Sequence, residues 1–137
     1  DDGGGDGDGN SSDPLDESRQ ACVDRINGFR ASEGLPAYAR WVDAEACSDG
    51  EALSDSQTGT PHGAFGQCGE NAQNECPGWP SIEDTLEGCL QMMWDEGPGD
   101  FAQHGHYLNM SSSSFSTVAC GFYVTESGAV WALQNFN

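Results

Sequence analysis

Apolar side chains recur at helical spacing in the first part of the chain. The recurring positions are Leu15, Ala21, Cys22, Ile26 and Phe29. Residues at this spacing lie along one side of an α-helix, so they predict a helix that begins near residue 15. Gly34 and Pro36 follow and are typical of a helix end.

The same periodicity predicts two further helices. The second covers about residues 43–56, with Asp43 as its N-cap. The third begins near Ser81, with Asp84 three residues on as in the capping pattern, and runs to Glu96. The segment Gly97-Pro98-Gly99 ends it.

Strand-like runs occupy the C-terminal end of the chain. Residues 117–125 and 129–136 are strand-like, and Glu126-Ser127-Gly128 between them predicts a hairpin turn. Residues 57–81 and 99–114 are predicted to be irregular, with a short helix around Asn71. Loops of this length in a compact domain tend to be functional.

The order of these elements indicates the fold class. Helices come first and strands last, and the helices can cover each face of a sheet, which is typical of an α+β protein. We predict a disulfide-stapled, three-layer α-β-α sandwich around a small, mainly antiparallel sheet. Residues 15–137 are predicted to form this single domain, and residues 1–14, which are acidic and rich in Gly and Ser, a disordered tether.

Cysteine content points to an oxidising compartment. The chain has six cysteines among 137 residues and no Cys-x-x-Cys pair, which argues against a zinc knuckle or a thioredoxin-type site. We predict that all are paired and that the protein is secreted or extracytoplasmic. The pairing itself stays open. One set consistent with the spacing is Cys68–Cys76, Cys22–Cys47 and Cys89–Cys120.

Charge excludes some classes of partner. The formal net charge is -19, with four arginines and no lysine. This charge repels phosphate backbones and anionic lipid headgroups, so nucleic acid is not expected as a partner. No apolar run approaches the ~20 residues of a membrane span. We expect a monomer, tethered if at all through its N-terminal segment.

The candidate chemistry lies in the histidines. His62, His104 and His106 are the only three, and each is next to a glycine in a segment predicted to be irregular. Glu70 and Glu96 lie in or beside the same segments. Two imidazoles with a carboxylate and water suit Zn²⁺ with an open coordination position. A carboxylate can also orient an imidazole that binds the metal.

Several segments together resemble the CAP superfamily (cysteine-rich secretory, antigen 5 and pathogenesis-related-1 proteins) of the bacterial secreted type. In chain order they are Asn27-x-x-Arg30-x-x-x-Gly34-Leu35-Pro36, Gly69-Glu70-Asn71, Met93-Trp94-Asp95-Glu96, Gly105-His106-Tyr107-Leu108-Asn109-Met110 and the run from Phe115 to Phe122. The resemblance extends from about residue 20 to residue 137 and agrees with the predicted fold class.

The resemblance implies a cleft with a His–Glu–Glu–His tetrad. Carried over position by position, the tetrad is His62, Glu70, Glu96 and His106. The two histidines would bind a divalent metal, expected to be zinc, and the two glutamates would support them. If residues 104–106 are extended, His104 points to the same side as His106 and can add a third ligand.

Three functions follow from such a cleft. The favoured one is a binding or interaction module for a lipid, a sterol or a peptide, with aromatic residues such as Phe65 and Phe101 as apolar walls. The second is a metal-dependent peptidase or esterase with Glu70 or Glu96 as general base. Its two histidines fall short of the three protein ligands usual in catalytic zinc sites. The third is a structural extracellular protein whose tetrad has no function.

Overall fold

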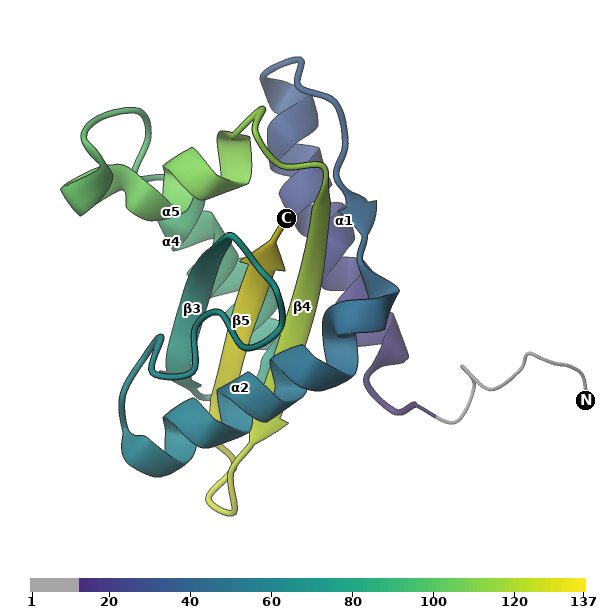
Figure 1. Ribbon diagram of the computed structural model, residues 1–137, viewed down its shortest axis with the longest axis vertical. Coiled ribbons are helices and arrows are strands. Elements are labelled where there is room, and N and C mark those ends of the chain that lie inside the picture. Colours follow the sequence, from purple (N-terminus) through teal and green to yellow (C-terminus); the bar gives the residue numbers. More distant parts are fainter. Residues whose placement is uncertain (1–12) are drawn as a thin grey trace, which may run out of the picture.

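A four-stranded sheet lies between two helical layers in the computed structural model, which describes residues 13–137 (Figure 1). The strand order is β2-β4-β5-β3. β4 pairs antiparallel with β5 and β5 antiparallel with β3, whereas the short β2 runs parallel to β4. The strands are β2 (Ala39–Arg40), β3 (Ala72–Trp79), β4 (Thr117–Val124) and β5 (Val130–Phe136).

Helices cover both faces of this sheet. α2 (Glu45–Thr58) lies across one face, and α1 (Asp16–Ser32) and α4 (Leu90–Trp94) cover the other (Figure 1). The predicted α+β class and three-layer sandwich are confirmed. Residues 1–12 of the predicted tether lie outside the described residues.

The first two helices end where glycine allows the chain to turn. Gly34 follows α1 with φ 74°, and Gly59 caps α2 with φ 64°. This left-handed conformation is common at helix ends and favours glycine. A short 3₁₀ turn, η2 (Val42–Ala44), precedes α2, so this helix begins slightly later than predicted.

The third predicted helix is one continuous run. It consists of α3 (Ile82–Asp84), the π turn η3 (Thr85–Cys89) and α4. The predicted cap is confirmed, because the Asp84 amide donates to Ser81 Oγ at 2.9 Å. At Gly88 a Cβ atom would lie only 2.9 Å from the Trp79 ring, so the missing side chain lets this helix approach β3.

The prediction of an irregular segment with a short helix around Asn71 is wrong for residues 72–79, which form β3. The polar run Gln73-Asn74-Glu75 has low strand propensity. Its backbone pairs with β5 in regular register from Ala72 opposite Phe136 to Cys76 opposite Ala132. A ladder partner distant in sequence therefore decides the conformation of this segment.

The predicted loop over residues 99–114 is also wrong in its central part, which forms α5 (Phe101–Ser111) with a kink at His104. Gly105 lowers the helix propensity of this segment. It packs under Phe101, where a Cβ atom would lie 3.2 Å from the ring. Contact with α4 and β3 stabilises a helix that local preference does not predict.

The two faces of the sheet differ in chemistry. The face toward α1 and α4 holds the apolar core, with Ile26, Leu90, Val118 and Phe136 all fully buried. The face toward α2 buries polar side chains instead, namely Ser48, Glu51, Asp55, Gln73, Glu75 and Asn135. Buried polar groups need hydrogen-bond partners, so this second face is organised by a hydrogen-bond network.

Three disulfides cross-link the domain, and no cysteine is free. The prediction that all six are paired is confirmed, but the suggested pairing is wrong in every bond. The bonds are Cys22–Cys120, Cys47–Cys68 and Cys76–Cys89. Cys76 cannot join Cys68 because β3 carries Cys76 inside toward the helix around residue 89.

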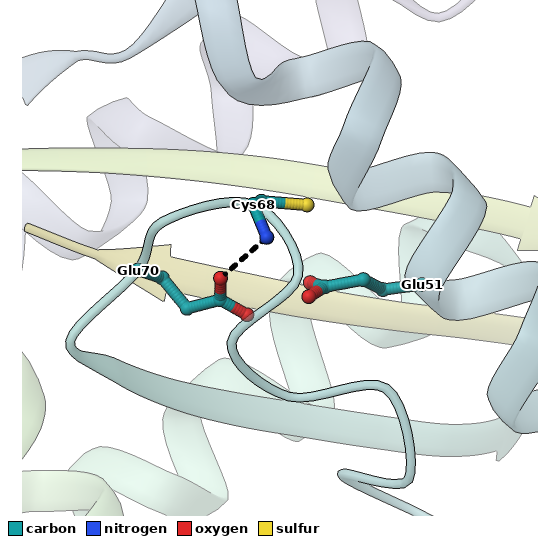
Figure 2. A group of neighbouring side chains, drawn as sticks. All are labelled: Glu51, Cys68 and Glu70. Carbon is teal, nitrogen blue, oxygen red and sulfur yellow. Dashed lines mark hydrogen bonds between the residues drawn. The ribbon is translucent and has the colours of Figure 1, made fainter.

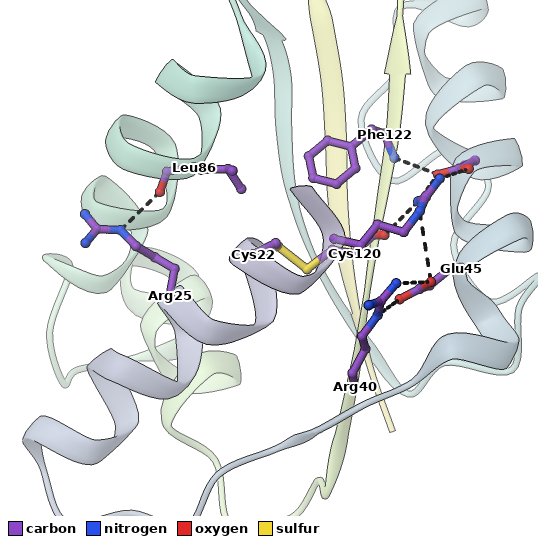
Figure 3. Close-up of a disulfide and its surroundings, with 9 residues drawn as sticks. Cys22, Arg25, Arg40, Glu45, Leu86, Cys120 and Phe122 are labelled. Atoms are coloured by element: carbon purple, nitrogen blue, oxygen red, sulfur yellow. Dashed lines mark hydrogen bonds and ion pairs between the residues drawn. A yellow bond between two sulfur atoms is a disulfide. The ribbon is translucent and has the colours of Figure 1, made fainter. Parts of the chain in front are cut away.

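The Cys22–Cys120 bond joins α1 to β4 beside a group of ion pairs (Figure 3). Arg19 is nearly buried and binds both carboxylate oxygens of Asp49 at 2.7 Å. Arg40 forms the same kind of two-point contact with Glu45, at 2.6 and 3.0 Å. These paired arginines tie α1 and β2 to α2.

Among residues 13–137, no helix has both the length and the apolar character needed to cross a membrane.

Candidate functional site

Three of the four predicted tetrad residues line one cavity. His62 comes from the turn after α2, Glu96 from the end of α4, and His106 from α5. They surround a cavity of about 220 Å³. Gln73 of β3 and Asn109 of α5 also line it. Segments that are far apart in sequence therefore meet around a single small space.

Glu96 holds His106 in place. Its Oε2 lies 2.6 Å from His106 Nδ1, and its Oε1 accepts the backbone amides of His106 and Tyr107 at 3.1 and 3.3 Å. A carboxylate only accepts hydrogen bonds, so Nδ1 of His106 carries the hydrogen. Its Nε2 makes no hydrogen bond within residues 13–137 and keeps its lone pair when the ring is neutral.

His62 is held by polar groups of β3. Its φ of 63° is left-handed, which is unusual for a residue with a side chain. The His62 amide donates to Glu75 Oε1 at 2.6 Å, which holds this conformation in place. The ring is half-exposed, and its Nδ1 lies 2.7 Å from Gln73 Oε1.

Glu70, the fourth predicted tetrad residue, is not among the residues that line the cavity. Its two oxygens accept the backbone amides of Gly66 and Cys68, both at 2.9 Å, so it closes the turn that leads into β3. Gln73 connects it to His62, because Gln73 Nε2 lies 3.4 Å from Glu70 Oε2. Glu70 therefore contacts His62 only indirectly, through the side chain of Gln73.

Glu70 faces a second buried carboxyl group, that of Glu51 on α2 (Figure 2). Burial and the hydrogen bond with Glu70 raise the pKa of Glu51 to about 8. Burial also acts to raise the pKa of Glu70, but hydrogen bonds from Glu51 and from the Gly66 and Cys68 amides outweigh it and lower that pKa. A proton on Glu51 therefore bridges the pair at neutral pH.

A similar carboxyl pair lies one helical turn further along α2. Burial raises the pKa of Glu75 to about 8, and a hydrogen bond to Asp55 on α2 acts in the same direction. Three buried carboxyl oxygens of the two pairs, Glu51 Oε2, Asp55 Oδ2 and Glu75 Oε2, have no donor when all the acids are ionised. One proton in each pair supplies the missing donor.

Glu51, Cys68 and Glu70 bring potential metal-ligand atoms within 4.8 Å of one another (Figure 2). The sulfur of Cys68 is bonded to Cys47, so it is not a thiolate. Amide donors already occupy both carboxyl groups. This arrangement fits a shared proton better than a metal ion.

His104 is turned away from the cavity. The extended backbone assumed in the sequence-based prediction is wrong, because residues 104–106 lie in α5. His104 Nδ1 lies 2.6 and 2.9 Å from the carbonyl oxygens of Glu96 and Gly97, to which it donates. It is not among the residues that line the cavity.

An apolar groove adjoins the cavity. It encloses about 380 Å³, and His62, Gln73, Phe65 and Phe101 are among the residues that line it. Phe65 and Phe101 are 48% and 66% exposed, which is unusual for large apolar side chains. Of the other aromatic residues near the tetrad, Trp94 stacks on Phe29 and packs against Tyr107 on the core side of the molecule.

Two residues around this site were not predicted from the sequence. Gln73 and Glu51 carry no motif, and each lies on an element whose buried face is unusually polar. Glu51 and Asp55 are one helical turn apart on α2, which places both on one face. Acidic residues at this spacing on the buried side of a helix are the only available sequence signal.

Comparison with known proteins gives a family and a fold. The family model described as "CAP: Cysteine-rich secretory protein family" matches residues 23–136. A search of curated proteins found no match.

Solved structures with a similar fold share little sequence with this chain. An outer surface protein from Borrelia burgdorferi has a TM-score of 0.65 at 11% identity, over 91% of this chain and 96% of that one. Na-ASP-1 has a TM-score of 0.62 at 13% identity over 88% of this chain, which spans only 38% of the Na-ASP-1 chain. Venom allergen-like protein 4 of Schistosoma mansoni has a TM-score of 0.57 at 12% identity, over 88% of this chain and 87% of that one.

Proposed function

The chain belongs to the CAP family of cysteine-rich secretory proteins, and we propose that it is a secreted binding module whose cleft holds a divalent metal through His62 and His106. Family membership implies a ligand-binding or interaction module in general. The observation that supports a metal site is that both imidazole rings are oriented through Nδ1. Each has Nδ1 engaged by an oxygen, of Gln73 or of Glu96, at 2.7 and 2.6 Å.

The donor set fits a zinc ion with open positions. Two imidazole Nε2 atoms would be the protein ligands, and water or a bound ligand would complete a four-coordinate site. Glu96 would fix the orientation of His106, as carboxylates commonly do for histidines that bind metals. Glu70 would act on His62 only through Gln73. A bound zinc would supply a Lewis acid.

The apolar groove supports a ligand with an apolar part. Phe65 and Phe101 line the groove and expose large ring surfaces. A lipid, a sterol or an apolar peptide side chain would cover these rings and place a polar group near the metal. The net charge of -19 opposes nucleic acid as the partner.

The environment we propose is extracellular. Three disulfides and membership of the CAP family fit that location. Residues 1–14 would tether the domain, which we propose extends over residues 15–137.

Hydrolysis is the weaker alternative. A general base needs a free oxygen within reach of the attacking water. Both oxygens of Glu96 accept hydrogen bonds from His106 and Tyr107, and both oxygens of Glu70 accept backbone amides outside the cavity. Neither carboxylate therefore offers a free base to a metal-bound water.

Isothermal titration with Zn²⁺ tests the metal site. The wild type should bind one equivalent, and His106→Ala should weaken binding at least tenfold. Gln57→Ala is the control and should bind like the wild type, because Gln57 is exposed on α2 and does not line the cavity. Equal binding by His106→Ala and the wild type would reject the proposal. An equal loss of binding in Gln57→Ala would also reject it.

Mass spectrometry of solvent extracts tests the groove. Purified wild type, incubated with a mixture of phospholipids, sterols and fatty acids and then washed, should retain one class. A Phe65→Ser, Phe101→Ser double variant should retain much less, because the two exposed rings are gone. Equal retention by both proteins would show that this groove is not where such ligands bind.

A further inference from the structure

The side-chain amide of Gln73 has a defined direction. Gln73 is 7% exposed, and its Nε2 faces three oxygens. These are Asn135 Oδ1 at 2.8 Å, Glu51 Oε1 at 3.1 Å and Glu70 Oε2 at 3.4 Å. Turning the amide over would set its own oxygen against these three acceptors. The oxygen of Gln73 must therefore be the atom that faces His62.

The direction is imposed by a series of hydrogen bonds that starts on α2. The Ser48 hydroxyl donates to the Ala44 carbonyl at 2.7 Å, which leaves Ser48 Oγ as an acceptor. Asn135 Nδ2 donates to Ser48 Oγ at 2.8 Å and to Glu51 Oε1 at 2.7 Å. Asn135 Oδ1 can then only accept, and it accepts from Gln73.

The last bond of the series reaches the cavity. Gln73 Oε1 lies 2.7 Å from His62 Nδ1, and a carbonyl oxygen is only an acceptor. The opposite tautomer, with hydrogen on Nε2, would set the Nδ1 lone pair against this oxygen. Glu75 Oε1 lies 3.7 Å from the same Nδ1, which is beyond hydrogen-bond distance, so the amide oxygen of Gln73 is the hydrogen-bond acceptor at this nitrogen.

We infer that Gln73 is a positioning residue that holds His62 in the Nδ1–H tautomer, so that its Nε2 lone pair faces the cavity. The inference rests on the proposed function in that a metal would bind this Nε2. The tautomer itself can be measured without a metal. Gln73 would act through His62 and would not itself bind the metal.

Long-range ¹H–¹⁵N NMR of the imidazole rings tests the inference on metal-free protein at a pH where the rings are neutral. His62 should give the Nδ1–H pattern in the wild type and shift toward the Nε2–H pattern in Gln73→Met, which keeps the length of the side chain but lacks the acceptor oxygen. Gln103→Met is the matched control. Gln103 lines the same cavity and makes no hydrogen bond to either histidine, so this variant should leave His62 unchanged. His106, held by Glu96, should keep its pattern in all three proteins and report that the fold is intact.

Zinc affinity gives the second measurement. Gln73→Met should weaken Zn²⁺ binding about 10- to 100-fold, the usual effect of removing a group that orients a metal ligand. Gln103→Met should bind zinc like the wild type. Unchanged zinc affinity in a folded Gln73→Met would overturn the positioning role.

The NMR result separates the two proposals. An Nε2–H pattern for His62 in the wild type overturns the inference whether or not Gln73→Met folds. So does an unchanged His62 pattern in a folded Gln73→Met. If the wild type fails to bind zinc and its His62 still shows the Nδ1–H pattern that Gln73→Met loses, the metal proposal fails and the tautomer assignment stands.

Discussion

The two buried carboxyl pairs predict that the protein becomes less stable as the pH rises. The pKa of Glu51 and that of Glu75 are both raised from 4.5 to about 8 in the folded protein. Between these values the folded state binds more protons than the unfolded chain, so stability falls with pH. The contribution is fully present below about pH 4.5 and is lost as the pH passes about 8.

The magnitude follows from the size of the change in proton affinity. A tenfold change corresponds to roughly 1.4 kcal/mol, so each carboxyl accounts for at most about 5 kcal/mol. We expect a loss of about 3 to 5 kcal/mol at the pair of Glu51 and Glu70 alone over this interval. The lowered pKa of Glu70 acts in the opposite direction, but only as the pH falls below 4.5, outside this interval.

Urea unfolding at several values from about pH 5 to about pH 9 measures this loss. Glu51→Gln supplies a permanent donor to Glu70 and keeps an acceptor for Asn135, so its free energy of unfolding should depend less on pH than that of the wild type. Glu87→Gln is the control, because Glu87 is exposed and its side chain makes no hydrogen bond within the described residues. A free energy of unfolding that stays constant or rises over this interval in the wild type would refute the reasoning. Equal pH slopes for Glu51→Gln and the wild type would locate the effect elsewhere.

Three further outcomes are expected. The Cys47–Cys68 bond should be the first reduced by a mild thiol in a mass-tagging experiment, because Cys47 is exposed and the other two disulfides are buried; prior reduction of a buried bond would contradict this. Gly121→Ala should lower the free energy of unfolding by about 1 to 3 kcal/mol in urea melts, because its Cβ atom would lie 2.5 Å from the backbone of α2. Gly50→Ala on α2 is its control and should be neutral or stabilising by up to about 1 kcal/mol, because the space around Gly50 is open. Equal free energies of unfolding for the two variants would contradict the prediction. Glu96→Gln should weaken Zn²⁺ binding about tenfold in calorimetry, with unchanged affinity as the contrary result.

Local sequence signals were sufficient where an element carries its own periodicity and ends. α1 has apolar residues at helical spacing and Gly34 at its end, and Ser81 caps the third helix as its side chain predicts. The hairpin of β4 and β5 has two strand-like runs around a short turn. In these segments local preference and tertiary packing agree, so one sequence contains enough information.

The site depended on more than local signals. Residue type alone made His62, Glu96 and His106 candidates, and the resemblance to the CAP family grouped them in one tetrad. Only the tertiary structure shows the cavity that all three line. Gln73 and Glu51 had no motif, because their role consists of contacts between β3 and α2. Residues that act through partners distant in sequence are invisible until those partners are placed.

By itself, the sequence determined the fold class, most of the helices, the terminal hairpin and the oxidised state of the cysteines. Each of these depends on the side chains of one segment or on composition. Only the tertiary structure decided that residues 72–79 form a strand, that residues 101–111 form a helix, and which cysteines pair. The physical reason is the same in each case. The stabilising partner is β5, the α4 and β3 surface, or a cysteine on another element, so the free energy that selects the conformation comes from contacts that no local window of the chain contains.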